Sequence, residues 1–503
     1  MKNLIEISKI VTKKKVRKIE LFDNAALEST ASKFNEFYEA LSGGKFKNDR
    51  DAATLLYGCS PTHDKYRQLK SRFRKRLMNT LFFIDVNLPS ASGYERAYFS
   101  VNKDWTLVKI LISNDAHLTA QDMAKSILTT ALKFRFADVI VNCCRILRQY
   151  AAEEGKEKEY AVYNDFLQEY TKVLDAEMHS EELFQKVLIE YRKPASELEG
   201  MIERMSGYCD ELVSLSETNE SPVVNYNMYL VWVYRYEMQR DYEAMLTVCQ
   251  QAEKYIEDHP NYYQEDKLAT FHLKKMTAYL HLRDFRNGRT NVERSLQTFP
   301  AGSKLWFGFL EYYLLLALHT DNYINAMAIF NRAISNSKFK KLNYQTREKW
   351  KIYETYLHYF METQTDKIAV LRAQASRTFR PKRFLNDPVI YPKHLRVYTI
   401  HLVIAQFLFL LEKGNYQMAT ERVDRLKKYA TKQLKKEDQS RMINFIRLLQ
   451  QLAKANYKIR NMSGTDKYYE RMVGKPLFYR GRIEELEIVP FEKLWDYILK
   501  QLG

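Results

Sequence analysis

Glycine and proline are scarce in this chain, which has 15 glycines and 11 prolines among 503 residues. Both residues interrupt helices, and a β-rich fold would need them in its many turns. The composition therefore predicts long helices and argues against a β-rich fold. A helical array can reach this length without one large core, because it grows by stacking repeats.

Cysteine and long apolar runs are also rare. The five cysteines show no pairing pattern: Cys59, Cys143, Cys144, Cys209 and Cys249. The most apolar stretch, Leu402–Leu411, is about half as long as a membrane-spanning helix and contains Gln406. Glu6 and Lys9 interrupt the apolar residues near the N-terminus, and no cleavage site follows them. We therefore expect a soluble cytoplasmic protein without a membrane partner.

Catalytic and metal-binding motifs are missing as well. Gly43-Gly44-Lys45 lacks the upstream glycine and the following Ser or Thr of a phosphate-binding loop, so we interpret it as a turn. Cys143 and Cys144 are neighbours that point to different faces of a helix, which indicates core residues. His272 and His401 fall on apolar stripes, where a hydrogen-bonded core histidine is expected. The sequence predicts no enzyme, no cofactor, no metal and no small-molecule substrate.

The net charge of +17 is distributed unevenly. Residues 1–90 hold 18 Lys and Arg against 10 Asp and Glu, and residues 371–503 hold 27 against 13. Residues 91–370 are slightly acidic in consequence. The two basic regions could meet an anionic partner, although such charge also serves solubility.

The strongest positive signal is a recurring pair of amphipathic helices. In residues 225–260, an apolar stripe at three- and four-residue spacing precedes Arg240-Asp241, a second stripe follows, and Pro260 ends the pair. The layout recurs around turns at residues 283–285, 321–323 and 413–416. An aromatic residue follows each turn: Tyr242, Phe285, Tyr323 and Tyr416. We expect each ring to be buried between the two helices of its own pair.

Three of these turns resemble the helix-to-helix turn of the tetratricopeptide-repeat family. They read Asp241-Tyr242-Glu243-Ala244, Asn322-Tyr323-Ile324-Asn325-Ala326 and Asn415-Tyr416-Gln417-Met418-Ala419. The resemblance covers about residues 220–460. The intervals exceed the family's roughly 34 residues, and the Trp and Leu-Gly positions of its first helix are missing. The resemblance implies a superhelix whose concave face holds a peptide or a protein.

The predicted fold is all-α, an α-solenoid of tetratricopeptide-like helix pairs behind a basic helical N-terminal domain. We divide the chain into that domain (1–100), helical hairpins and long helices (101–220), tetratricopeptide-like repeats (221–485) and a C-terminal capping helix (486–503). Within the second region, Ser180 is expected to cap the start of a new helix. Pro490 is expected to begin the capping helix.

Two basic groups are candidates for binding an anion or nucleic acid. The first lies on a helix that follows a short helix and a Gly-containing turn, an order that permits a helix-turn-helix. Its members are Lys65, Arg67, Lys70, Arg72, Arg74, Lys75 and Arg76. They could contact phosphates, or they could form an ordinary solvated face. The second group lies in a predicted loop: Arg372, Arg377, Arg380, Lys382 and Arg383.

These patterns favour an intracellular scaffold or regulator of protein–protein interaction. Stacked helix pairs offer an extended groove for a protein or peptide partner, and tyrosines are frequent at strong contact points. The alternative is a nucleic-acid-binding regulator that uses the basic N-terminal helices.

Overall fold

The computed structural model describes residues 33–46, 48–81, 93–193, 200–263, 265–363, 379–386, 391–392, 395–434 and 439–503. These residues form 21 α-helices and no strand, which confirms the all-helical prediction. The chain divides into two compact units, Met1–Tyr170 and Thr171–Gly503. Each unit is described by itself.

The first unit begins with a bundle of three helices, α3 (Lys33–Ser42), α4 (Asp49–Tyr57) and α5 (Asp64–Leu81). Aromatic rings form much of its core, and the centroids of Phe37 and Phe73 lie 4.4 Å apart. Asn48 caps α4 by accepting the Asp51 N–H, and Gly58 ends the helix with φ of 60°. Both ends of α4 are therefore fixed by local sequence.

The unit continues with α6 (Gly93–Ser113), α7 (His117–Phe134), α8 (Ala137–Glu153) and the first part of α9 (Glu157–Tyr191). Cys143 and Cys144 are fully buried in α8, as predicted. The expected helix start at Ser180 is wrong, because α9 runs unbroken through it. The Ser180 hydroxyl donates to the Glu177 carbonyl at 2.8 Å, so its polar group is satisfied inside the helix.

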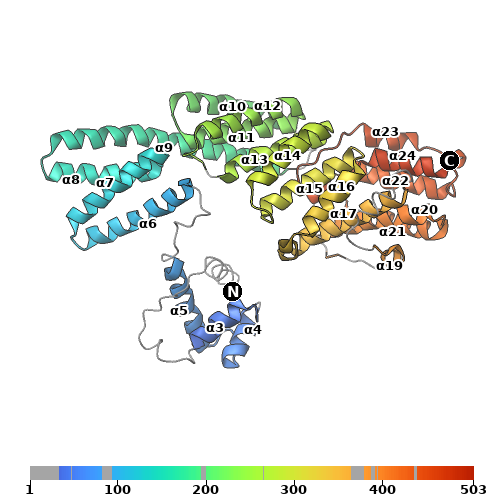
Figure 1. Ribbon diagram of the computed structural model, residues 1–503, viewed down its shortest axis with the longest axis horizontal. Helices are drawn as coiled ribbons and strands as arrows, with labels where there is room; N and C mark the ends of the chain where they lie inside the picture. The colour runs from blue at the N-terminus through green and yellow to red at the C-terminus, as the bar shows by residue number, and fades with distance from the viewer. Residues whose placement is uncertain are drawn as a thin grey trace. The chain divides into compact units, whose positions relative to one another are not determined.

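The second unit contains the rest of α9 and fourteen further helices in the described residues. They are α10 (Met201–Thr218), α11 (Pro222–Gln239), α12 (Tyr242–Asp258), α13 (Glu265–Leu282), α14 (Phe285–Thr298), α15 (Lys304–His319), α16 (Tyr323–Ile334), α17 (Tyr344–Thr363), α19 (Pro381–Asn386), α20 (Arg396–Glu412), α21 (Tyr416–Gln433), α22 (Ser440–Lys454), α23 (Asp466–Val473) and α24 (Phe491–Leu502). Most neighbours in sequence pack on each other as hairpins (Figure 1).

One turn geometry closes the hairpins α11–α12, α13–α14, α15–α16 and α20–α21. The first helix of each hairpin is followed by a residue in the left-handed region: Arg240, Arg283, Asp321 and Gly414, with φ of 62°, 55°, 60° and 65°. The next N–H returns to a carbonyl in the last turn of that helix, as Asp241 does to Tyr236 at 3.0 Å. The Asp241 side chain then caps α12. This explains why the apolar periodicity breaks at these positions.

The four turn aromatics pack on rings of the following helix pair. The ring pairs are Tyr242–His281 at 4.4 Å, Phe285–Tyr313 at 5.9 Å, Tyr323–Phe360 at 4.5 Å and Tyr416–Tyr457 at 4.7 Å. We expected each ring to be buried between the two helices of its own pair. That expectation is wrong, because each ring stacks on a ring of the next pair. Tyr416 is also 44% exposed, while Tyr323 is buried as expected. The rings link each helix pair to the next.

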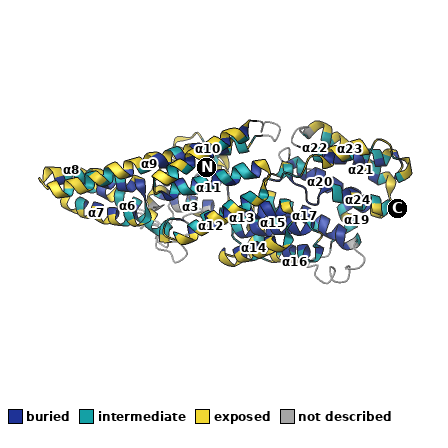
Figure 2. Cartoon of the chain, turned by 90° about the horizontal axis from the view of Figure 1, so that it is seen from above, coloured by how far each residue is buried: buried dark blue, intermediate teal, exposed yellow. Residues whose placement is uncertain are grey.

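The core of the second unit centres on its two most apolar helices, α15 and α20. In α20 every residue from Tyr398 to Leu411 is buried, so the apolar run at Leu402–Leu411 belongs to a core helix. Figure 2 shows the dark blue of buried residues concentrated at α15, α17 and α20. No helix in the described part of the chain has the length and apolar character needed to cross a membrane.

Candidate polypeptide-binding site

Between α23 and α24 the chain runs without an α-helix, through residues 474–490, here called the return segment. It contains one short 3₁₀ turn, Ile483–Glu485. Its contacts extend to the C-terminal end of α9 and to α13, α15 and α22. Tyr479, Leu486, Ile488 and Val489 are all at most 3% exposed. The helices of the second unit therefore enclose a non-helical stretch of the same chain, which turns back on itself between Arg480 and Glu485.

Side chains from separate helices hold the main chain of this segment. His281 at the end of α13 donates from Nε2 to the Tyr479 carbonyl at 3.1 Å. His319 at the end of α15 donates from Nε2 to the Glu487 carbonyl at 2.7 Å. Gln439, before α22, donates to the Glu484 carbonyl at 3.3 Å. Such contacts recognise the backbone whatever the side chain attached to it.

Both histidines are neutral at neutral pH. Burial lowers the pKa of His281 to about 4 and that of His319 to about 3. Burial likewise lowers the pKa of His401 to about 4, and His401 lies in the core as predicted. A neutral imidazole has one N–H, and a carbonyl can only accept, so the return segment fixes the proton of His281 and His319 on Nε2.

Arg480 anchors the end of the return segment that lies near α9. Its side chain is 2% exposed, and its Nη1 donates to the Tyr191 carbonyl at 2.6 Å. Its Nε donates to Glu485 at 2.9 Å, and its guanidinium lies 5.3 Å from the Tyr191 ring centroid. Burial raises the pKa of Glu485, while Arg480 acts in the opposite direction. The buried charge is therefore paired and hydrogen-bonded.

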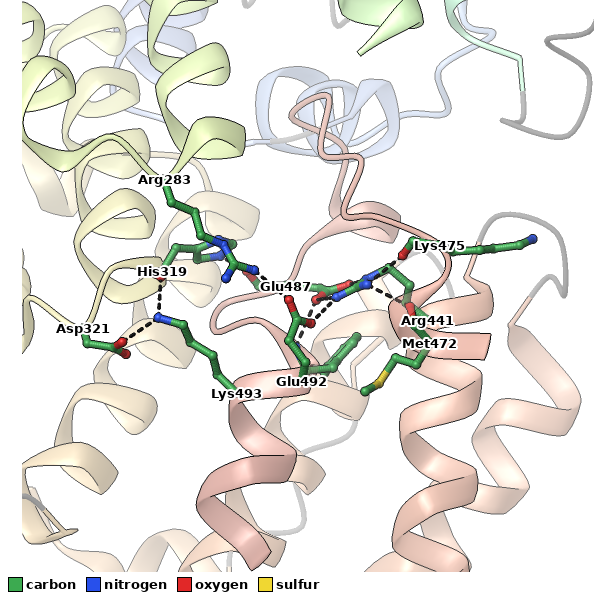
Figure 3. Close-up of polar contacts among 10 residues, drawn as sticks. Arg283, His319, Asp321, Arg441, Met472, Lys475, Glu487, Glu492 and Lys493 are labelled. Atoms are coloured by element: carbon green, nitrogen blue, oxygen red, sulfur yellow. Dashed lines mark hydrogen bonds and ion pairs between the residues drawn. The ribbon is translucent and has the colours of Figure 1, made fainter. Parts of the chain in front are cut away.

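Arg441 of α22 binds both ends of the return segment (Figure 3). Its Nε and Nη2 donate to Glu487 at 2.6 and 3.0 Å, and it also pairs with Glu492. Its Nη1 donates to the carbonyls of Met472 and Lys475 at 2.9 and 2.7 Å. Burial opposes the charge on Arg441, but the two carboxylates outweigh it and hold its pKa above the ordinary value.

The following helix, α24, is tied to earlier helices by a second set of ion pairs. Glu492 accepts from Arg283 at 2.6 Å. Lys493 donates to Asp321 at 2.5 Å and to the His319 carbonyl at 2.8 Å (Figure 3). The return segment is therefore held at each end and along its length.

The predicted basic residues of α5 lie mostly on its solvent face. Lys65, Arg67, Arg72, Arg74 and Lys75 are exposed. The remaining two are engaged inside the bundle. The ammonium of Lys70 donates to Asp49 at 2.6 Å, and the Arg76 guanidinium lies 4.9 Å from the Phe34 ring centroid. Five of the seven cations are thus exposed, and one of them, Arg67, lies 3.6 Å from the Asp64 carboxylate in a surface ion pair.

The second predicted basic group is described only in part. Arg372 and Arg377 lie outside the described residues. Arg380, Lys382 and Arg383 are exposed. The loop prediction is wrong for the last two, which lie in the short helix α19, held to α20 by the buried Leu385.

The return segment was not predicted from the sequence. Residues 474–485 fall within the predicted repeats, although no helical periodicity continues there and Gly474, Pro476 and Gly481 fall close together. The available signal of a buried non-helical segment is the apolar run of Leu486, Ile488 and Val489 outside any amphipathic helix.

Comparisons with known proteins found no counterpart for this arrangement. No family model, no characterised protein and no solved structure matches the chain. In the described residues, no group of three or more His, Cys, Asp or Glu side chains could hold a metal ion.

Proposed function

We propose that the helix pairs of the second unit form a tetratricopeptide-like array that acts as a polypeptide-binding scaffold. The observation that carries this proposal is the return segment, a non-helical stretch whose carbonyls accept hydrogen bonds from side chains of α13, α15 and α22. A surface that binds the backbone of its own chain in this way suits a non-helical segment of a partner. The partner would bind when part of the return segment dissociates from this surface.

The chemistry of the occupant indicates what a partner should offer. Tyr479 packs against Tyr312 with ring centroids 6.0 Å apart, and Arg480 enters a site built from the Tyr191 ring and carbonyl. A partner segment should therefore present an aromatic residue followed by arginine. Backbone carbonyls at the positions of Tyr479 and Glu487 would accept from the two histidines.

This proposal can be tested with a labelled peptide of residues 474–490 and the full-length protein. The wild type should bind it weakly, because its own segment competes at a high effective concentration. A full-length Tyr479→Ala, Arg480→Ala variant should bind the peptide at least about tenfold more tightly than the wild type does. Fluorescence anisotropy measures both affinities, and circular dichroism checks that the variant is folded.

The matched control is a peptide in which the same two residues are alanine. If the folded variant protein binds both peptides equally, the surface does not recognise polypeptide in the proposed way. Co-purification of the tagged protein from its native cells, with and without nuclease, then separates the two functions. A protein partner that persists after nuclease supports the scaffold, and loss of every partner favours nucleic acid.

A second candidate function, nucleic-acid binding, is favoured by the five exposed cations of α5. Replacing Arg67, Arg72 and Arg74 with Ala should weaken binding to duplex DNA and reduce its salt dependence by roughly one unit for each lost phosphate contact. Lys70→Ala is the control, since Lys70 is paired with Asp49 and should affect stability more than binding. Wild-type protein that binds neither DNA nor RNA at low salt would rule this function out.

A further inference from the structure

A cavity of about 450 Å³ lies between one face of α22 and the C-terminal turn of α23. Four of its residues recur at helical spacing along α22, so they share one face of that helix. The lining consists of Ser440, Ile443, Asn444, Arg447, Arg471, Gly474 and Lys475. The cavity is separate from the contacts that hold the return segment, although both involve the turn at residues 472–475.

The charge of this lining is all of one sign. Arg447, Arg471 and Lys475 supply three cations, and no lining residue is acidic. Among the described residues, none of the three forms an ion pair with a carboxylate. The Arg447 guanidinium is half-buried, 5.5 Å from the Tyr468 ring centroid, and Lys475 points away from the Arg441 network in Figure 3. The cations are therefore left to bind something outside the chain.

Two main-chain carbonyl groups close to Arg471 and Lys475 are already bound by another side chain. A helix C-terminus has free carbonyls that would attract positive charge. Here Arg441 takes the carbonyls of Met472 and Lys475, at 2.9 and 2.7 Å. These two carbonyl groups are thus bound by Arg441.

A buried amide is also incompletely satisfied at this cavity. Asn444 is 4% exposed, its Nδ2 donates to the Ser440 hydroxyl at 3.3 Å, and its Oδ1 has no hydrogen-bond partner. An unpaired buried amide oxygen is destabilising.

We propose that this cavity binds a phosphorylated small molecule. Three cations without a neighbouring carboxylate favour a ligand that carries about two negative charges or more. A phosphate ester carries such a charge at neutral pH, whereas a single carboxylate does not. Arginine binds phosphate oxygens through paired N–H groups, and lysine binds them as a point charge. The volume exceeds that of one phosphate, and Ile443 offers an apolar wall for the rest of the ligand.

Isothermal titration of the full-length protein with pyrophosphate, AMP and adenosine tests the proposal. Pyrophosphate and AMP should bind, and adenosine should not. AMP binding more tightly than pyrophosphate indicates that the ligand is nucleotide-like, whereas the reverse order indicates that the phosphate groups alone are recognised. Absence of binding by both phosphate compounds at low salt overturns the proposal.

The variant Arg447→Gln, Arg471→Gln, Lys475→Gln should lose at least tenfold in affinity for pyrophosphate. The matched control is Lys413→Gln, Lys427→Gln, Lys428→Gln, which removes the same charge from exposed positions elsewhere in the unit. Equal losses in the two variants would mean general charge attraction and no site. If the first variant does not fold, Lys475→Gln alone, at an exposed position, should still lose several-fold. The proposal does not rest on the peptide-binding function, so the two experiments fail independently.

Discussion

At the scale of single residues, the turn aromatics differ in burial although they occupy equivalent positions. Tyr323 is 4% exposed and stacks on Phe360, whereas Tyr416 is 44% exposed. We expect Tyr323→Ala to destabilise the protein by about 3–5 kcal/mol, the usual cost of removing a core aromatic. Tyr416→Ala should cost about 1 kcal/mol, because much of its ring stays in water.

Phe285, which is half-buried against Tyr313, should fall between these two values. Urea unfolding of the three alanine variants measures the order. Equal losses at all three positions would mean that burial in the folded structure does not set the contribution of these rings.

The buried histidines make stability depend on pH. The pKa of His319 is about 3 in the folded protein against an ordinary value of 6.5, so the unfolded chain binds more protons between these values. Stability is therefore fully present above pH 6.5 and is lost as the pH falls toward 3. His319 alone should contribute a loss of about 1.4 kcal/mol for each pH unit below 6.5.

A His319→Gln variant should be less stable than the wild type at pH 7.5 and should show a smaller further loss between pH 6.5 and 5. Urea midpoints at these pH values provide the measurement. An identical slope in both proteins would show that His319 is not the group that resists protonation.

At the scale of elements, two glycines should respond to alanine with opposite signs. Gly414 has φ of 65° at the turn before α21, and Gly308 lies in the middle of α15; an added Cβ would meet no atom within 4 Å at either. Gly414→Ala should cost about 1–2 kcal/mol through the left-handed backbone. Gly308→Ala should stabilise the protein by about 0.5–1 kcal/mol, because alanine favours the helix.

Thermal unfolding of the two variants checks the pair of signs. Each acts as the control for the other, since the substitution is the same and neither site is crowded. A gain in stability for Gly414→Ala would mean that this turn does not adopt the left-handed conformation.

Helices and their turns could be predicted from sequence because they depend on local patterns. The turns after Gln239 and Leu282 fall where polar residues interrupt the apolar stripes, and α24 begins one residue after the predicted start, with Pro490 as its N-cap. Local patterns give a wrong prediction where tertiary contacts determine the role of a side chain. Ser180 has the chemistry of a cap, but its hydroxyl serves Glu177 inside α9 and accepts from Asn227 of α11 at 3.0 Å.

The candidate sites were less predictable than the fold. Exposure of most cations on α5 follows from the apolar stripe of Tyr66, Leu69 and Phe73, but the pairing of Lys70 with Asp49 depends on how the helices cross. The return segment depends on contacts such as that between Arg480 and Tyr191, which are 289 residues apart. No periodicity in the sequence indicates a pairing at such a distance.

At the scale of the whole molecule, these distant contacts should make the second unit unfold cooperatively. Arrays in which each repeat contacts only its neighbours can lose terminal repeats one at a time. Here a chain ending at Val473 would leave the sites for Arg480 and Glu487 empty. We expect it to keep much of its far-UV helical signal but to melt over a broader range and to lose more than about 4–5 kcal/mol.

Calorimetry of this truncation and of the full chain tests the expectation. A full-length Tyr479→Ala variant serves as the comparison, since it removes one contact and retains the segment. If the truncated chain melts as sharply and at the same temperature as the full chain, the return segment does not hold the helices together.

The distance between Arg480 and Tyr191 also has a consequence for how the protein is made. A ribosome adding roughly 5–20 residues per second needs about 15–60 s to pass from α9 to the return segment. Throughout that interval the nascent chain carries the acceptor carbonyl of Tyr191 without its final partner, and the imidazoles of His281 and His319 also lack theirs from the time they are made. The young protein should therefore depend on chaperones late in translation, at a stage when most of its helices have already emerged.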